Sequence, residues 1–249
     1  MKQQTYYKTD IGKVREHNED AVNIYRNENC VLMVVADGVG GHQAGDIASQ
    51  LAMGKIDQAF SDQVAFKDEE AARKWMKKIL SEINQEILNY IEEQQITRMG
   101  TTLVMAAIME SFIAFAHIGD SRAYILAYEQ LRQVTKDHTF VRKLVEEGQL
   151  SERAAKMHPR RNVIVNALGL GASEDLKFDF LTLENYNVDA VLVCTDGLTA
   201  EVEDKKIAEI LTGASTTSEK ANQLIDLANK NGGSDNISVA LCEFGGDPL

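Results

Sequence analysis

The stretch VLMVVADG at residues 31–38 has a counterpart in AVLVCTDG at residues 190–197. In both, a short apolar run rich in Val and Leu indicates a buried strand, and the run ends in Asp-Gly. A carboxylate at the end of a buried strand is costly unless it is solvated, paired or bound to a cation. Asp120 and Asp235 also lie beside strand-like segments. Four strand-edge aspartates, far apart in the sequence, predict one shared metal site.

On either side of these stretches, the pattern of apolar residues predicts a mixed α/β protein in which strand clusters alternate with helix pairs. The glycine-rich residues 37–42 are expected to form a loop. In residues 139–172, Gly and Pro interrupt the helical spacing, which indicates an appended subdomain or flap. The apolar stripe of the second long helix is expected to pack in the core. Strands are expected at residues 5–12, 21–26, 31–36, 100–108, 112–118, 123–127, 190–195 and 237–244, and helices at residues 44–60, 68–95, 203–212 and 218–230.

The composition favours a single domain that spans residues 1–249. Of these residues 44% are hydrophobic and only two are prolines. A net charge of −12 without a basic run argues against nucleic acid or an anionic membrane surface as the partner. Three cysteines without CxxC spacing indicate free thiols in a reducing compartment. Because no secretory leader or bilayer-length apolar run is found, the expected location is the cytoplasm.

The chemistry of carboxylates narrows the kind of site. Two carboxylates about 4 Å apart repel each other by about 4 kcal/mol at an effective dielectric constant of about 20, so a cluster takes up protons or binds cations. Oxygen ligands without nearby His or Cys select Mg²⁺ or Mn²⁺ over zinc or copper. Each aspartate also has a purely structural interpretation. These are a turn for Asp37 and Asp196, a solvated loop for Asp235, and a turn cap or an ion pair with Arg122 for Asp120.

The neighbouring residues favour the metal interpretation, because a series of separated motifs accompanies the aspartates. The motifs occur in the order TDIG at 9–12, REHNED at 15–20, DGVGGH at 37–42, GTT at 100–102, IGDSR at 118–122, DH at 137–138, TDGL at 195–198 and SDN at 234–236. From Thr9 to about Leu241, this series resembles the metal-dependent protein serine/threonine phosphatases, the PPM or type 2C family. The short form of the chain is similar to the bacterial branch of that family.

The resemblance implies a set of metal ligands. Asp37 would bridge two metal ions, with the carbonyl of Gly38 on one of them. Asp196 and Asp235 would ligate the other ion. Asp120 would help to hold a third, weaker ion beside Asp196, as in bacterial members.

The resemblance also implies roles for residues around the metals. Glu19 and Asp20 would orient metal-bound waters. Arg15 would bind the substrate phosphate through its planar guanidinium. The alternative for Arg15 is a surface ion pair with Glu16 or Glu19.

The fold that the resemblance implies is a central β-sandwich of two antiparallel sheets flanked by helix pairs, an α-β-β-α arrangement, with the metals in a cleft at one end. The reaction that it implies is direct hydrolysis of phosphoserine or phosphothreonine on proteins by a metal-bridging hydroxide, without a phospho-enzyme intermediate.

Two positions depart from the family pattern. Val39 lies where animal relatives commonly have His and bacterial ones usually have Met, and valine cannot donate a proton. The proton for the leaving alkoxide is then expected from a metal-bound water, with His42 as the second choice. Thr195 replaces the more usual Ser and keeps the hydroxyl.

The expected partners are phosphorylated proteins, namely a cognate Ser/Thr protein kinase and its substrates. The enzyme is expected to act as a monomer with two or three Mn²⁺ or Mg²⁺ ions per chain. The basic residues of the segment 139–172 either dock acidic phosphoprotein segments or are merely solvated. One alternative function is a non-catalytic phosphoprotein-binding regulator on the same fold, in which loss of a metal aspartate or of Arg15 would be expected. The other is a metal-dependent hydrolase of a small phosphate compound or nucleotide.

Overall fold

The strands of the chain form two antiparallel sheets. The computed structural model describes residues 2–40, 44–61, 66–171 and 176–245. The first sheet has the strand order β2-β3-β5-β6-β9, with β4 paired to β3, and the second has the order β1-β11-β10-β7-β8. The strands are β1 (Lys2–Asp10), β2 (Asp20–Arg26), β3 (Val31–Gly40), β4 (Met99–Thr101), β5 (Leu103–Ile108), β6 (Phe112–Ile118), β7 (Arg122–Ala127), β8 (Gln130–Gln133), β9 (Asp179–Glu184), β10 (Ala190–Cys194) and β11 (Ile237–Gly245).

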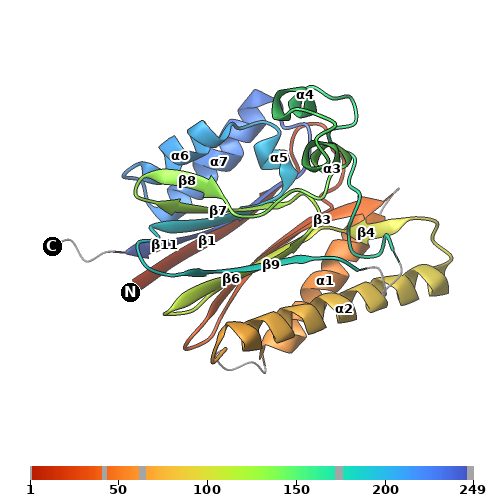
Figure 1. The fold of residues 1–249 in the computed structure, drawn as a ribbon, viewed down its shortest axis with the longest axis horizontal. Helices are drawn as coiled ribbons and strands as arrows, with labels where there is room; N and C mark the ends of the chain where they lie inside the picture. The colour runs from red at the N-terminus through yellow and green to blue at the C-terminus, as the bar shows by residue number, and fades with distance from the viewer. Residues whose placement is uncertain (1, 41–43, 62–65, 172–175, 246–249) are drawn as a thin grey trace.

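Helix pairs cover the outer faces of both sheets (Figure 1). Helices α1 and α2 pack on the first sheet, and α6 and α7 pack on the second. The expected α-β-β-α arrangement is therefore confirmed. The helices are α1 (Ala44–Ser61), α2 (Glu69–Gln94), α3 (Phe140–Glu146), α4 (Glu152–Lys156), α5 (Asp196–Thr199), α6 (Asp204–Thr212) and α7 (Thr217–Asn231). No helix in the described ranges combines the length and the apolar character that a membrane span needs.

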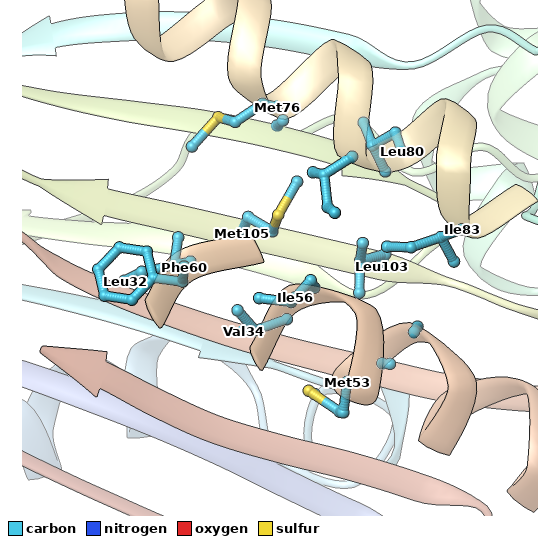
Figure 2. Close-up of a cluster of buried hydrophobic side chains, with 14 of the residues drawn as sticks. Leu32, Val34, Met53, Ile56, Phe60, Met76, Leu80, Ile83, Leu103 and Met105 are labelled. Atoms are coloured by element: carbon cyan, nitrogen blue, oxygen red, sulfur yellow. The ribbon is translucent and has the colours of Figure 1, made fainter. Parts of the chain in front are cut away.

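The continuous apolar run 31–36 is explained by burial on both faces of β3. Val31, Met33 and Val35 face the second sheet, whereas Leu32 and Val34 face the helices. Side chains alternate between the faces of a strand, so a strand covered on both sides is apolar at every position. Figure 2 shows the helix-facing layer, in which side chains of β3 and β5 meet those of α1 and α2. The stripe on α2 is core packing, as predicted.

The glycine-rich segment differs from the prediction. Residues 37–40 are not a loop, because β3 continues through Gly40 and pairs with β4. The reason lies in close packing: a Cβ atom on Gly38 would lie 2.2 Å from the carbonyl oxygen of Gly45 in α1. Glycine therefore serves here to admit a helix against a strand. Residues 41–43, with His42, lie outside the described part of the chain.

Three further elements were not predicted, and one predicted strand is divided. Strands β8 and β9 and the short helix α5 have no strong apolar period, and the predicted strand 100–108 is interrupted at Thr102 between β4 and β5. Helices α3 and α4 lie within the segment 139–172, the last residue of which is outside the described ranges. The end of this segment is attached to the body of the protein, since Leu168 and Thr101 exchange two backbone hydrogen bonds.

Candidate metal centre

The register of the strands brings the predicted aspartates to one end of the sandwich. In the second sheet, Cys194 of β10 lies opposite Arg122 of β7 and Val239 of β11. Asp196, just after β10, is therefore next to Asp120, just before β7, and next to Asp235, just before β11. In the first sheet, Asp20 lies directly opposite Asp37. In Figure 1 the termini lie at the left, and α3 and α4 lie away from them.

Burial and mutual repulsion raise the pKa values of Asp37, Asp120 and Asp196. Burial raises the pKa of Asp37 well above its usual value, and the charges of neighbouring aspartates raise it further. Burial and the charge of Asp196 do the same for Asp120. Burial and the charge of Asp235 raise the pKa of Asp196 to about 6. Such a cluster binds protons or cations at neutral pH.

The donor set fits hard divalent cations. Oδ1 of Asp120 is buried and makes no hydrogen bond, although a buried carboxylate oxygen normally has a partner. No three of the described aspartate carboxylates converge within 4.8 Å of one another. An ion here would therefore be held by one or two carboxylates and completed by water, which is typical of Mg²⁺ and related ions. The alternative ion pair of Asp120 is not formed, because Arg122 makes a bidentate contact with Asp137.

Asp20 is fixed by a buried hydroxyl. Oγ1 of Thr195 donates to Oδ2 of Asp20 at 2.8 Å and accepts a hydrogen bond from the backbone N–H of Ser238. Asp20 is only 5% exposed. Burial raises its pKa to about 7, against the effect of hydrogen bonds from Ser238 and Thr195. The hydroxyl of Thr195, just after β10, thus links this strand to β2 and β11.

Arg15 is paired with a predicted metal ligand. Its Nη2 atom lies 2.8 Å from Oδ2 of Asp235, and the side chain is half exposed. The alternative ion pairs with Glu16 or Glu19 are not formed. Glu19 lies beside the start of α1, and burial raises the pKa of its carboxyl group.

Asn236 is a residue whose importance the sequence did not reveal. Its side-chain oxygen accepts the backbone N–H of Glu19, and its amide group donates to the carbonyl oxygens of Ile11 and His17. These three hydrogen bonds hold the connection between β1 and β2, which carries Arg15. The position after Asp235 in the SDN motif was the only signal in the sequence.

Gly38 holds its place through backbone contacts. Its N–H donates to the carbonyl oxygen of Glu19 at 3.1 Å. Val39 is the next residue of β3 and lies opposite Gly100.

A second group of ligand-type side chains lies near the aspartates. The ligand atoms of His117, His138 and Asp179 lie within 4.8 Å of one another. Nδ1 of His138 accepts the backbone N–H of Gly119 at 3.2 Å, so neutral His138 carries its proton on Nε2. That atom faces Asp179 at 3.5 Å, and a metal ion would need its lone pair. We therefore interpret the group as a hydrogen-bonded His-Asp contact.

A cleft of about 1100 Å³ extends from the aspartates. Asp120 and Asp196 line it, together with residues of the segment that holds α3 and α4. The start of α6 contributes Glu203, Asp204 and Lys205. The site is thus open to a segment of another molecule.

Comparisons with known proteins agree with this geometry. The sequence model of the family described as Protein phosphatase 2C matches residues 13–229. The serine/threonine phosphatase stp of Listeria monocytogenes is 40% identical over 239 residues, which cover 95% of this chain and 94% of the relative. Protein phosphatase PhpP of Streptococcus pneumoniae is 37% identical over 235 residues, 94% of each chain.

Solved structures of serine/threonine phosphatases have the same fold as this chain. The serine/threonine phosphatase Stp1 from Staphylococcus aureus has a TM-score of 0.92 at 33% identity, covering 99% of this chain and 96% of that one. The catalytic domain of PstP in complex with 2 manganese ions has a TM-score of 0.83 at 33% identity, covering 97% of each chain. The chain therefore belongs to the protein phosphatase 2C family. It is a protein serine/threonine phosphatase that depends on divalent metal, and the alternative of a non-catalytic regulator is not supported.

Proposed function

We propose that Asp37, Asp196 and Asp235 hold two divalent cations, Mn²⁺ or Mg²⁺, and that Asp120 with Asp196 holds a third, weaker one. The carbonyl oxygen of Gly38 would complete one of the first two sites. The observation that carries the proposal is the strand register, which brings these aspartates to one end of the sandwich, with the hydrogen bond from Thr195 to Asp20 joining the two sheets there. The buried, unpaired Oδ1 of Asp120 supports the third site. The 2 manganese ions in PstP support the count of two.

Residues around the cations bind the phosphoryl group and orient water. Cations bound here lower the pKa of water and neutralise charge on a phosphoryl group. Arg15 donates to the phosphoryl oxygens, since its guanidinium has five N–H donors and the contact with Asp235 leaves others available. Asp20 and Glu19 accept hydrogen bonds from water molecules and so orient them. The side chain of Val39 has no group that can donate a proton, so we assign protonation of the leaving alkoxide to a water molecule.

The substrate in this proposal is an exposed phosphorylated segment of a protein, bound in the cleft. Residues 139–172 act as a flap within a single catalytic domain that spans residues 1–249. Within the described ranges, Lys156, Arg161 and Lys205 line the cleft without a carboxylate at ion-pair distance. These free cations support docking of acidic segments next to the phosphorylated residue.

We further propose that the enzyme opposes a cognate Ser/Thr protein kinase, as a monomer in the cytoplasm. The free, buried state of all three cysteines is compatible with a reducing compartment. Sizing with light scattering tests the monomer, and a mass well above 27.6 kDa contradicts it.

Phosphate release from a phosphothreonine peptide tests the assignment. We expect turnover that requires Mn²⁺, stops with EDTA and falls at least about 1000-fold in Asp196→Ala. The matched control is Asp226→Ala, which removes an exposed aspartate of α7 and leaves turnover unchanged. Activity that persists in EDTA and in Asp196→Ala refutes the metal assignment. Faster turnover of nucleotides than of the peptide favours a hydrolase of small phosphate compounds.

A further inference from the structure

Thr102 lies between the two segments that carry Asp37 and Asp120. It occupies the break between β4 and β5 and is fully buried. The GTT motif to which it belongs supplies none of the proposed ligands. The hydrogen bonds of Thr102 nevertheless join it to the segment of Asp37 and to the segment of Asp120.

On one side, Thr102 binds the backbone of Asp37 at both polar groups. Its N–H donates to the Asp37 carbonyl oxygen at 2.9 Å, and its Oγ1 accepts the Asp37 N–H at 3.0 Å. The hydroxyl thus takes the place of a backbone carbonyl where the strand is interrupted. Both the position and the orientation of the Asp37 peptide depend on it.

On the other side, Thr102 contacts the turn that carries Asp120. Its Oγ1 lies 2.8 Å from Oγ of Ser121, which is also buried. Its Cβ and methyl group pack against Gly119, where an added Cβ atom would lie 2.5 Å from both. Gly119 has a φ of +103°, a conformation that glycine adopts readily and other residues rarely do. The turn around Asp120 therefore packs against the side chain of Thr102 on both sides of Asp120.

We propose that Thr102 is a positioning residue that fixes the distance between Asp37 and Asp120, and so couples the cation site at Asp120 to the site at Asp37. This inference rests on the proposed function. The two carboxylates repel each other, since both carry negative charge when they bind cations. A rigid connection is needed to keep them at a separation that suits cations. The hydroxyl is the connecting group, because it accepts the backbone N–H of Asp37 and also hydrogen-bonds the side-chain hydroxyl of Ser121, next to Asp120.

The test compares Thr102→Val, which removes the hydroxyl and keeps the shape, with Thr102→Ser, which keeps the hydroxyl. The readout is Mn²⁺ binding to the protein by calorimetry, with melting in EDTA as a check on folding. In Thr102→Val we expect Mn²⁺ to bind about tenfold more weakly at the weakest site, because the backbone N–H of Asp37 loses its acceptor. In Thr102→Ser we expect Mn²⁺ affinity within about twofold of wild type. Thr135→Val is the matched control, since its buried hydroxyl accepts only the N–H of Ala123.

A double-mutant cycle with Asp120→Asn tests the coupling itself. We expect that Thr102→Val causes no further loss of Mn²⁺ binding once Asp120 is changed. In turnover of the phosphothreonine peptide, Thr102→Val lowers kcat and leaves KM within about twofold. Wild-type Mn²⁺ binding in Thr102→Val, or losses that add in the double variant, overturns the role of Thr102 while the metal assignment stands. Unchanged Mn²⁺ binding in Asp120→Asn overturns both.

Discussion

The buried carboxylate of Asp20 leads to a prediction about the metal-free enzyme. Burial raises its pKa from 3.8 to about 7. The folded protein thus holds a proton between these pH values that the unfolded chain releases, so stability falls as pH rises through this window. The difference between the two pKa values corresponds to about 4 kcal/mol above pH 7. Because neighbouring aspartates titrate with Asp20 as a group, we take about half, about 2 kcal/mol, as the part that belongs to this residue.

The perturbation is Asp20→Asn, which keeps the shape and one acceptor oxygen for Thr195. A change of about 2 kcal/mol shifts the melting temperature of a chain of this size by about 6 °C. We expect the melting temperature of the wild type in EDTA to fall between pH 5 and pH 8. At pH 8 the variant melts about 6 °C higher than the wild type, and the difference falls to about 2 °C at pH 5, which is still above the pKa of 3.8 from which the shift starts.

The assay is thermal unfolding followed by circular dichroism, in EDTA and in saturating Mn²⁺. Asp226→Asn carries the same change of charge on the exposed face of α7 and serves as the control. With Mn²⁺ bound, the cations offset the negative charge and the advantage of Asp20→Asn disappears. Equal pH dependence of wild type and Asp20→Asn in EDTA refutes the reasoning.

Three other substitutions have definite expected costs. Gly38→Ala places a methyl group within 2.2 Å of a backbone oxygen, and we expect about 3 kcal/mol lower stability in urea unfolding; a loss below about 1 kcal/mol contradicts the close packing. Asn236→Ala removes three hydrogen bonds from residues 11–19, and we expect about 3 kcal/mol lower stability, with an unchanged urea midpoint as the contrary result. Lys220→Met leaves the partly buried Glu243 without its cation, at a cost of about 2 kcal/mol, which Lys220→Met with Glu243→Gln should largely restore; an unchanged urea midpoint in Lys220→Met contradicts this.

Much of the fold was predictable because its buried strands are apolar on both faces. The runs at residues 31–36 and 190–195 identify β3 and β10, and helical spacing identifies α2. The short strands β8 and β9 were missed because they lie at sheet edges, where residues are only partly buried and no strong alternation is needed. The strand at residues 37–40 was missed because glycine usually signals a turn, and only the packing of α1 against Gly38 explains its use here.

The aspartates could be predicted as candidate ligands from the sequence. The residues that hold them in place through hydrogen bonds could not. A carboxylate after a buried strand stands out because burial makes it costly. Thr102 and Asn236 do not stand out, since threonine and asparagine occur in many loops and turns. What gives them a role is the register of strands distant in the sequence, which hydrophobic patterns do not specify.

The placement of Asp37 on a strand, and not on a loop, bears on why this end of the sandwich binds metal. Carboxylates on a mobile loop can move apart and relieve their repulsion without a cation. Asp37 cannot, because β3 is paired with β2 on one side, and Thr102 binds both of its backbone polar groups. The repulsion is therefore retained in the metal-free fold, where it lowers stability, and is relieved when cations bind. The stability that the protein gains on binding metal grows with the metal concentration relative to Kd. Because the rigid strand keeps the carboxylates together, the repulsion that destabilises the metal-free protein also increases its affinity for metal.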